Sequence, residues 1–169
     1  MTAPQRYSVV VAKEYLKFAA AHFIAYPGFR EPLHGHNYQM SVRVEAALGP
    51  DGYVLDFGVV KRVAKTLCEE LDERVVLPER SDCLTVRDEG DVVSVTTETG
   101  DHFAFPRADV RLLPIVHSSA EELAAYLLER LRVALANEAG GRTLVSLEVG
   151  VAEAPGQIAY CRLACDGSS

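Results

Sequence analysis

Apolar and polar residues alternate in several stretches of the chain, which is typical of half-buried β-strands. In residues 37–48, every second side chain from Tyr38 to Val44 is apolar and those between are polar. Residues 7–14 are rich in β-branched side chains, and we expect the strand to continue through residues 15–24. Residues 143–152 and 158–164 have the same character. A tight turn at residues 49–52 predicts that residues 53–57 return as a hairpin partner.

Two other stretches have the period of an amphipathic helix. Apolar residues recur at helical spacing from Val59 to Leu71, which predicts a helix over residues 58–71. Ser118 and Ser119 precede two glutamates, as at a helix N-terminus, and leucines at every fourth position carry this helix to about Asn137. Gly140-Gly141 is expected to end it.

Residues 78–113 contain short apolar runs separated by polar turns, which predicts a small β insertion. The insertion is too short to bury a core of its own, so residues 1–169 are expected to form a single domain. The order of elements predicts an α+β fold, a four-stranded antiparallel sheet with two helices on one face. Residues 25–32, which contain Pro27-Gly28 and Pro32, are expected to be a loop.

Composition narrows the class of protein. The chain has 169 residues, 49% hydrophobic and 24% charged, with a net charge of −7, which argues against nucleic acid as the main partner. No apolar run approaches the roughly 18 residues of a membrane span, and the N-terminus lacks a signal-peptide pattern. We therefore expect a cytoplasmic protein that does not bind membranes, with four free cysteines.

Three histidines form a candidate metal site. His34 and His36 are two residues apart, so they point to the same face of an extended strand. His22 closes a preceding apolar run and would join them if the two strands are neighbours. Three imidazoles with an open fourth position are typical of catalytic zinc. The alternative is a His-Gly-His turn with ordinary surface histidines.

Several separated motifs resemble the 6-pyruvoyltetrahydropterin synthase / 6-carboxytetrahydropterin synthase family. They are Phe18-x-Ala20-Ala21-His22, His34-Gly35-His36-Asn37-Tyr38, Val54-Leu55-Asp56-Phe57, Ser119-Ala120-Glu121, and Glu153 followed by Ile158-Ala159-Tyr160. The resemblance covers the chain except residues 78–113. It implies the tunnelling fold, a homo-oligomer (trimer or hexamer) with active sites between subunits, a pterin substrate, and Zn²⁺ held by His22, His34 and His36.

The resemblance also implies roles for residues outside the histidine cluster. Glu153 would anchor the pterin, because a carboxylate can accept hydrogen bonds from a ring NH and the adjacent amino group. Ser119 and Glu121 would add pterin contacts, although their spacing fits a plain helix cap equally well. Asp56 is expected to act structurally, through turn or cap hydrogen bonds. Asp72 occupies the position of the aspartate in the family's Leu-Asp-His proton relay.

The sequence departs from the family pattern at two positions. Where other members carry a catalytic cysteine, this chain has Gly28 or Arg30, depending on the spacing used. Glu31 instead begins a Glu-x-x-His-Gly-His sequence, which resembles a third class that makes 6-hydroxymethyl-dihydropterin, a folate precursor. The relay histidine is replaced by Glu73, and His117 is the candidate to supply an imidazole in its place.

Three functional hypotheses follow. The first is a zinc-dependent lyase that cleaves the side chain of 7,8-dihydroneopterin, or its triphosphate, with Glu31 as base. The second is 6-carboxytetrahydropterin synthase activity, as in queuosine biosynthesis, or 6-pyruvoyltetrahydropterin synthase activity. The third is a pterin-binding protein without catalysis. A zinc hydrolase is disfavoured because the sequence lacks His-Glu-x-x-His.

Overall fold

A computed structural model describes residues 5–138 and 143–165 of the chain, and its main sheet has the predicted antiparallel centre. The neighbouring strands run in the order β11-β10-β4-β1. Their bounds are β1 Tyr7–His22, β4 His34–Ala46, β10 Leu144–Ala154 and β11 Gln157–Ala164. The α+β fold is thereby confirmed, as are the four strands expected from alternation.

Two further strands extend this sheet beyond β1, and the sequence pattern did not predict them. Strand β5 (Arg74–Pro78) pairs parallel with the end of β1, and β9 (Val110–Leu113) pairs parallel with β5. The end of β5 is buried at three successive residues rather than at every second one. Parallel strands covered on both faces read as continuous apolar runs, so alternation does not reveal them.

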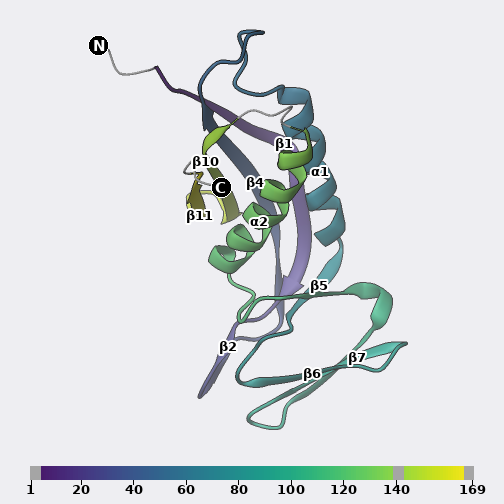
Figure 1. Ribbon diagram of the computed structural model, residues 1–169. Coiled ribbons are helices and arrows are strands. Elements are labelled where there is room, and N and C mark those ends of the chain that lie inside the picture. The colour runs from purple at the N-terminus through teal and green to yellow at the C-terminus, as the bar shows by residue number, and fades with distance from the viewer. Residues whose placement is uncertain (1–4, 139–142, 166–169) are drawn as a thin grey trace.

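Two helices cover one face of the main sheet, and Figure 1 shows them side by side along the long strands. Helix α1 (Phe57–Leu71) begins at Asp56, whose carboxylate accepts the Gly58 amide at 2.7 Å, as expected of a cap. Helix α2 (Ala120–Glu138) begins after Ser119, whose Oγ accepts the Glu122 amide. The expected end of α2 at residues 140–141 lies outside the described residues. The main core fills the space between the helices and the sheet.

The prediction that residues 53–57 form the second strand of a hairpin is wrong. Gly49 donates to the Tyr53 carbonyl at 2.8 Å, which closes a loop instead of a strand ladder. Val54 and Leu55 then turn into the main core, and the helix begins immediately after Asp56. The apolar residues in this segment therefore anchor the entry to α1 rather than a β-strand.

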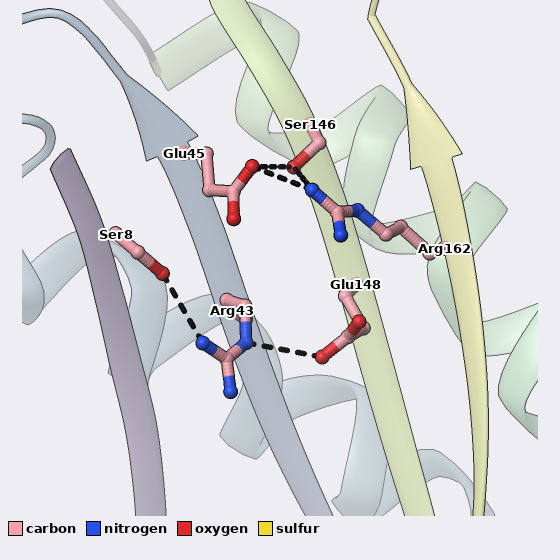
Figure 2. A network of polar contacts seen from close by, with 6 residues as sticks. All are labelled: Ser8, Arg43, Glu45, Ser146, Glu148 and Arg162. Carbon is pink, nitrogen blue, oxygen red and sulfur yellow. Dashed lines mark hydrogen bonds and ion pairs between the residues drawn. The ribbon is translucent and has the colours of Figure 1, made fainter. Parts of the chain in front are cut away.

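The opposite face of the main sheet carries a network of polar side chains, and Figure 2 shows these side chains in contact across neighbouring strands. Arg43 Nε donates to Glu148 at 3.1 Å, and Arg162 donates to Glu45 at 2.6 Å. Glu45 also accepts from Ser146 Oγ at 2.7 Å, and this hydrogen bond and the neighbouring guanidinium groups lower the pKa of its carboxyl group. Alternation in these strands thus separates an apolar face under the helices from an exposed face, which carries this network together with exposed apolar side chains such as Val10 and Tyr160.

Within the predicted insertion at residues 78–113, residues 84–106 form a separate three-stranded sheet, which lies below one end of the main sheet in Figure 1, whereas both ends of the range belong to strands of the main sheet. Its strands are β6 Leu84–Asp88, β7 Val92–Thr97 and β8 His102–Pro106, and a 3₁₀ turn at Arg107–Asp109 leads into β9. A second hydrophobic cluster joins this sheet to Phe23, Ala25, Leu77 and Val110. The insertion therefore does not fold over a core of its own, but shares one with the segment that follows β1.

Residues 25–32 are a loop, as predicted, that contains a small hairpin of strands β2 (Ala25–Tyr26) and β3 (Phe29–Arg30). Pro27 and Gly28 form the turn, and Gly28 has the positive φ of 82° that glycine adopts at little cost. No helix in the described parts of the chain is long and apolar enough to cross a membrane.

Candidate metal and substrate site

Antiparallel pairing of β1 and β4 brings the three candidate histidines together. His22 pairs directly with His34, and Ala20 pairs with His36 in the same register. Ligand nitrogens of the three rings all lie within 4.8 Å of one another, and the ring centroids are 4.6 to 5.3 Å apart. The rings therefore converge as predicted, and a surface His-Gly-His turn is excluded because both residues lie in a strand.

Gly35, between the two histidines, fits the close approach of these strands. A Cβ atom at this position would lie 3.1 Å from the Ala20 carbonyl oxygen, tighter than most such contacts. A side chain there would push β4 away from β1, and with it His34 and His36 from His22. In the His-Gly-His sequence, the histidines thus supply the candidate ligands, and the glycine allows the two strands to lie close enough for the rings to meet.

Hydrogen bonds to backbone carbonyls orient two of the rings. His22 Nδ1 lies 2.7 Å from the Ser118 carbonyl oxygen, and His34 Nδ1 lies 2.9 Å from the Pro32 carbonyl oxygen. A carbonyl oxygen only accepts, so each Nδ1 carries a proton and donates, which leaves Nε2 as the ring atom that can bind a metal. Fixing a ligand histidine through its other nitrogen is the usual outer-shell arrangement at metal sites.

The protonation state of His22 suits a ligand. Its ring is 2% exposed, and this burial lowers its pKa despite the opposing hydrogen bond to Ser118. The positive charges that His34 and His36 can carry lower the pKa further. The imidazole is therefore neutral at pH 7, which is the form that binds metals. Three imidazole nitrogens on a firm strand pair can hold one divalent transition metal ion and leave a position open.

Tyr38 belongs to the site, although it was expected only to line the apolar face of β4. Its side chain is fully buried and its hydroxyl lies 3.0 Å from His22 Nε2. Burial, followed by the negative charge and hydrogen bond of Glu153 and then the charge of Glu31, raises its pKa. The signal was present in the sequence, since Tyr38 lies on the same strand face as His34 and His36.

Glu31 and Glu153, the candidate base and the candidate pterin anchor, lie in different elements. Glu153 is half-buried near the end of β10, close enough to oppose the lowering of the His22 pKa. Glu31 lies in the loop after β3, where its Oε2 accepts the Ile24 amide at 3.0 Å and its own amide donates to the Ile24 carbonyl at 2.9 Å. Tyr38 lies beside His22, and the negative charges of both carboxylates act on its hydroxyl group.

The other predicted site residues have mainly local contacts. Asp72 Oδ1 accepts the Ala19 amide at 2.7 Å, and its own amide ends α1 on the Cys68 carbonyl. Ser119 caps α2, as its spacing allowed, and Glu121 is exposed in the first turn of that helix. The His117 amide donates to Glu122, and its buried Nδ1 has no hydrogen-bond partner among the described residues. Among the described residues, the hydrogen bonds of Asp72 lead to Ala19 and Cys68 and not to the histidine cluster.

Comparison of the sequence with known protein families identifies the family of this chain. The profile of the 6-pyruvoyl tetrahydropterin synthase family matches residues 11–164, which is nearly the whole chain. The chain belongs to this family of pterin enzymes. Its motifs, its fold and its histidine cluster agree with that membership, and the family resemblance seen in the sequence is confirmed.

Individual relatives differ in the activity that their names give. A *Methanocaldococcus jannaschii* protein, provisionally named 6-carboxy-5,6,7,8-tetrahydropterin synthase, is 30% identical over 87% of this chain and 90% of its own. The crystal structure of *Plasmodium vivax* 6-pyruvoyl tetrahydropterin synthase matches with a TM-score of 0.90 and 37% identity, over 95% of this chain and 99% of that one. Two further *P. vivax* structures carry alanine or cysteine in place of a glutamate described as catalytic. The tunnelling fold is thereby confirmed.

Proposed function

We propose that this protein is a zinc-dependent pterin lyase that cleaves the side chain of 7,8-dihydroneopterin, or of its triphosphate, to 6-hydroxymethyl-dihydropterin. One observation carries the proposal. The buried Tyr38 hydroxyl lies beside His22 Nε2, and the charges of Glu153 and Glu31 both act on it. A candidate metal ligand, a candidate anchor and a candidate base therefore converge, each from a different segment of the chain.

Glu153 is proposed to hold the pterin ring. Its carboxylate is half-buried, so hydrogen bonds to it are less exposed to competing water. Two oxygens can accept from the ring NH and the adjacent amino group, which fixes the ring's orientation as well as its position. Ser119 and Glu121, at the start of α2, are proposed to add further contacts.

Glu31 is proposed to act as the general base. Its carboxylate takes the proton of the side-chain hydroxyl next to the bond that breaks, and the electrons of that O–H bond form a carbonyl. The electrons of the broken C–C bond pass into the pterin, whose new carbanion is then protonated to give the hydroxymethyl group. His117 is proposed to deliver protons in place of the relay histidine, whose position holds Glu73.

His22, His34 and His36 are proposed to hold the zinc ion. A bound zinc ion would act as a Lewis acid on the side-chain oxygen atoms of the substrate. The chain's own contribution is the orientation of the three rings by the Ser118 and Pro32 carbonyls and by the strand pairing.

The second candidate is 6-carboxytetrahydropterin synthase activity, which the provisional name of the *M. jannaschii* relative favours. The P. vivax variants support a glutamate as the catalytic base, because the glutamate that they replace is described as catalytic in a protein of the same fold, whose name gives the 6-pyruvoyl activity of the second candidate. The absence of cysteine at positions 28 and 30 also favours a carboxylate base.

The product distinguishes these candidates. Zinc-loaded protein would be incubated with 7,8-dihydroneopterin and with its triphosphate, and the products separated by chromatography and identified by mass. We expect 6-hydroxymethyl-dihydropterin. A 6-carboxy or 6-pyruvoyl product would replace the proposal by the second candidate, and tight pterin binding without turnover would indicate a pterin-binding protein.

We also propose a homo-oligomer whose active sites lie between subunits. In this chain Asp72 bonds to Ala19 rather than to the histidine cluster, so a role for its carboxylate in catalysis would require a second copy. Mixing inactive His34→Ala and Asp72→Asn proteins under conditions that exchange subunits tests this idea. Recovery of part of the activity is expected, whereas no recovery from subunits that demonstrably mix would contradict a shared site.

A further inference from the structure

The insertion contacts the loop that carries Glu31 through a set of polar contacts. Arg30 Nε and Nη2 donate to Asp101 Oδ2 at 3.2 and 3.1 Å, across 71 residues of sequence. The Gly28 amide donates to Glu98 Oε2 at 3.1 Å. Both carboxylates lie at the turn between β7 and β8, so one turn of the insertion holds the small hairpin at two points.

Arg30 links this turn to Glu31 itself. Its third nitrogen, Nη1, donates to the Glu31 carbonyl at 2.9 Å. Its guanidinium carbon lies 5.3 Å from the centre of the Phe103 ring and 6.0 Å from that of Phe23, and those two rings stack on each other. The guanidinium group is thus fixed by an ion pair, by aromatic rings and by the backbone of the proposed base.

The turn of the insertion is itself well held. The Asp101 amide donates to Thr97 Oγ1 at 3.0 Å, and Thr99 Oγ1 donates to the same Asp101 oxygen that accepts Arg30. Gly100 donates to the Thr97 carbonyl and adopts a φ of 87°, which closes the turn tightly. These hydrogen bonds hold Asp101 in place within its own turn, in addition to its contact with Arg30.

We propose that Arg30 and Asp101 are positioning residues, through which the insertion sets the position of the Glu31 carboxylate relative to the histidine cluster. The inference rests on the proposed role of Glu31 as base. Glu31 has its own hydrogen bonds to Ile24, which fix its carboxylate to the end of β1. The Arg30 contact fixes the carbonyl side of the same residue, so Glu31 is held from two directions.

A purely structural role predicts a different result from a positioning role. Exposed ion pairs contribute little to stability, and the side chains of Arg30 and Asp101 are 28% and 48% exposed. Loss of this pair should therefore leave the fold and the metal site intact. A displaced base, in contrast, slows the chemical step by up to about 100-fold for a shift on the order of 1 Å.

The test compares Asp101→Asn with a matched control, Asp88→Asn. Asp88 forms an ion pair with Arg107 at 2.6 Å on the same insertion, with similar exposure but no contact to the Glu31 loop. For zinc-loaded protein turning over dihydroneopterin triphosphate, Asp101→Asn should lower kcat at least tenfold with little change in KM or zinc content. Asp88→Asn should leave all three unchanged, and Asp101→Glu, which keeps the carboxylate, should recover part of kcat.

A second comparison separates this inference from the proposed function. In the Glu31→Gln background, Asp101→Asn should have no further effect, because the group that it positions is already lost. Wild-type kcat in Asp101→Asn, together with a large loss in Glu31→Gln, would overturn the inference and leave the proposed function standing. Wild-type kcat in Glu31→Gln would overturn both.

A readout independent of turnover is amide hydrogen exchange. The Ile24 and Glu31 amides are both hydrogen-bonded between the end of β1 and the loop, so they report how firmly the loop is held. Exchange at both should be at least about tenfold faster in Asp101→Asn than in the wild type or in Asp88→Asn. Equal rates in all three proteins would contradict the proposed positioning.

Discussion

The two hydrophobic clusters of this chain support two different parts of the proposed active site. The main core, between two helices and the long strands, supports His22, His34 and His36 by direct strand pairing. The smaller cluster, between the insertion and the segment after β1, supports the loop that carries Glu31. The candidate metal ligands thus lie on the sheet, whereas the candidate base lies on a loop that contacts a later segment of the chain.

This difference indicates how members of one fold can change their reaction. Ligand histidines fixed by the register of β1 and β4 cannot move without disturbing the whole sheet. A loop at the edge of that sheet can change its reactive residue while the metal site remains. Under the proposed function, a glutamate on this loop takes the role of the cysteine used by other members, and the contacts of Asp101 with Arg30 help to hold that loop.

The largest expected effect is loss of the metal site. His22→Ala removes a buried ring that is oriented by the Ser118 carbonyl, and should abolish stoichiometric zinc binding and turnover. His102→Ala is the matched control, because His102 lies on the exposed side of the insertion and contacts only Thr96 through its ring. Metal analysis of the purified proteins gives the result, and full zinc content in His22→Ala would contradict the proposed ligand set.

Two core substitutions should separate the roles of the two clusters. Leu127→Ala, in the fully buried face of α2, should lower the free energy of unfolding by about 2–5 kcal/mol without changing kcat of the protein that remains folded. Val93→Ala, in the insertion, should cost only about 0.5–3 kcal/mol but lower kcat, because it loosens the support of the Glu31 loop. Chemical denaturation and steady-state kinetics measure the two effects, and a lower kcat in Leu127→Ala alone would reverse the assignment.

The smallest effect is a difference in thiol reactivity. Cys68, in the main core, is 1% exposed, and burial followed by the charges of Asp72 and Glu69 raises its pKa to about 12. Cys83, in the insertion cluster, is 9% exposed. At pH 8 iodoacetamide should therefore label Cys83 before Cys68, and mass spectrometry of peptides gives the order. Faster labelling of Cys68 would show that the main core opens more readily than the insertion.

Much of the fold could be predicted because its central strands follow local rules. The alternation around Tyr38 to Val44 fixed which face of β4 is buried, and Asp56 and Ser119 marked the starts of both helices. Strands β5 and β9 were missed because they pair parallel and are buried without alternation. The prediction of a hairpin strand at residues 53–57 was wrong because a turn followed by apolar residues fits both a hairpin and the packed entry to a helix.

The site could be predicted where it depends on strand register and not where it depends on distant contacts. The spacing of His34 and His36 indicates one face of a strand, and the pairing then adds His22. The contact of Asp101 with Arg30 spans 71 residues between two loops, and nothing in the local sequence of either indicates it. The assignment of Tyr38 to the core was incomplete, because a tyrosine can pack as an apolar residue and still place its hydroxyl in a site.

Zinc content and turnover measured together on Glu31→Gln test most directly whether the metal site and the base are supported separately. The substitution keeps the size of the side chain and removes its charge. We predict one zinc ion per chain, as in the wild type, with kcat on dihydroneopterin triphosphate lowered by about 10²–10⁴-fold. Loss of zinc from Glu31→Gln, or wild-type turnover by it, would contradict the account.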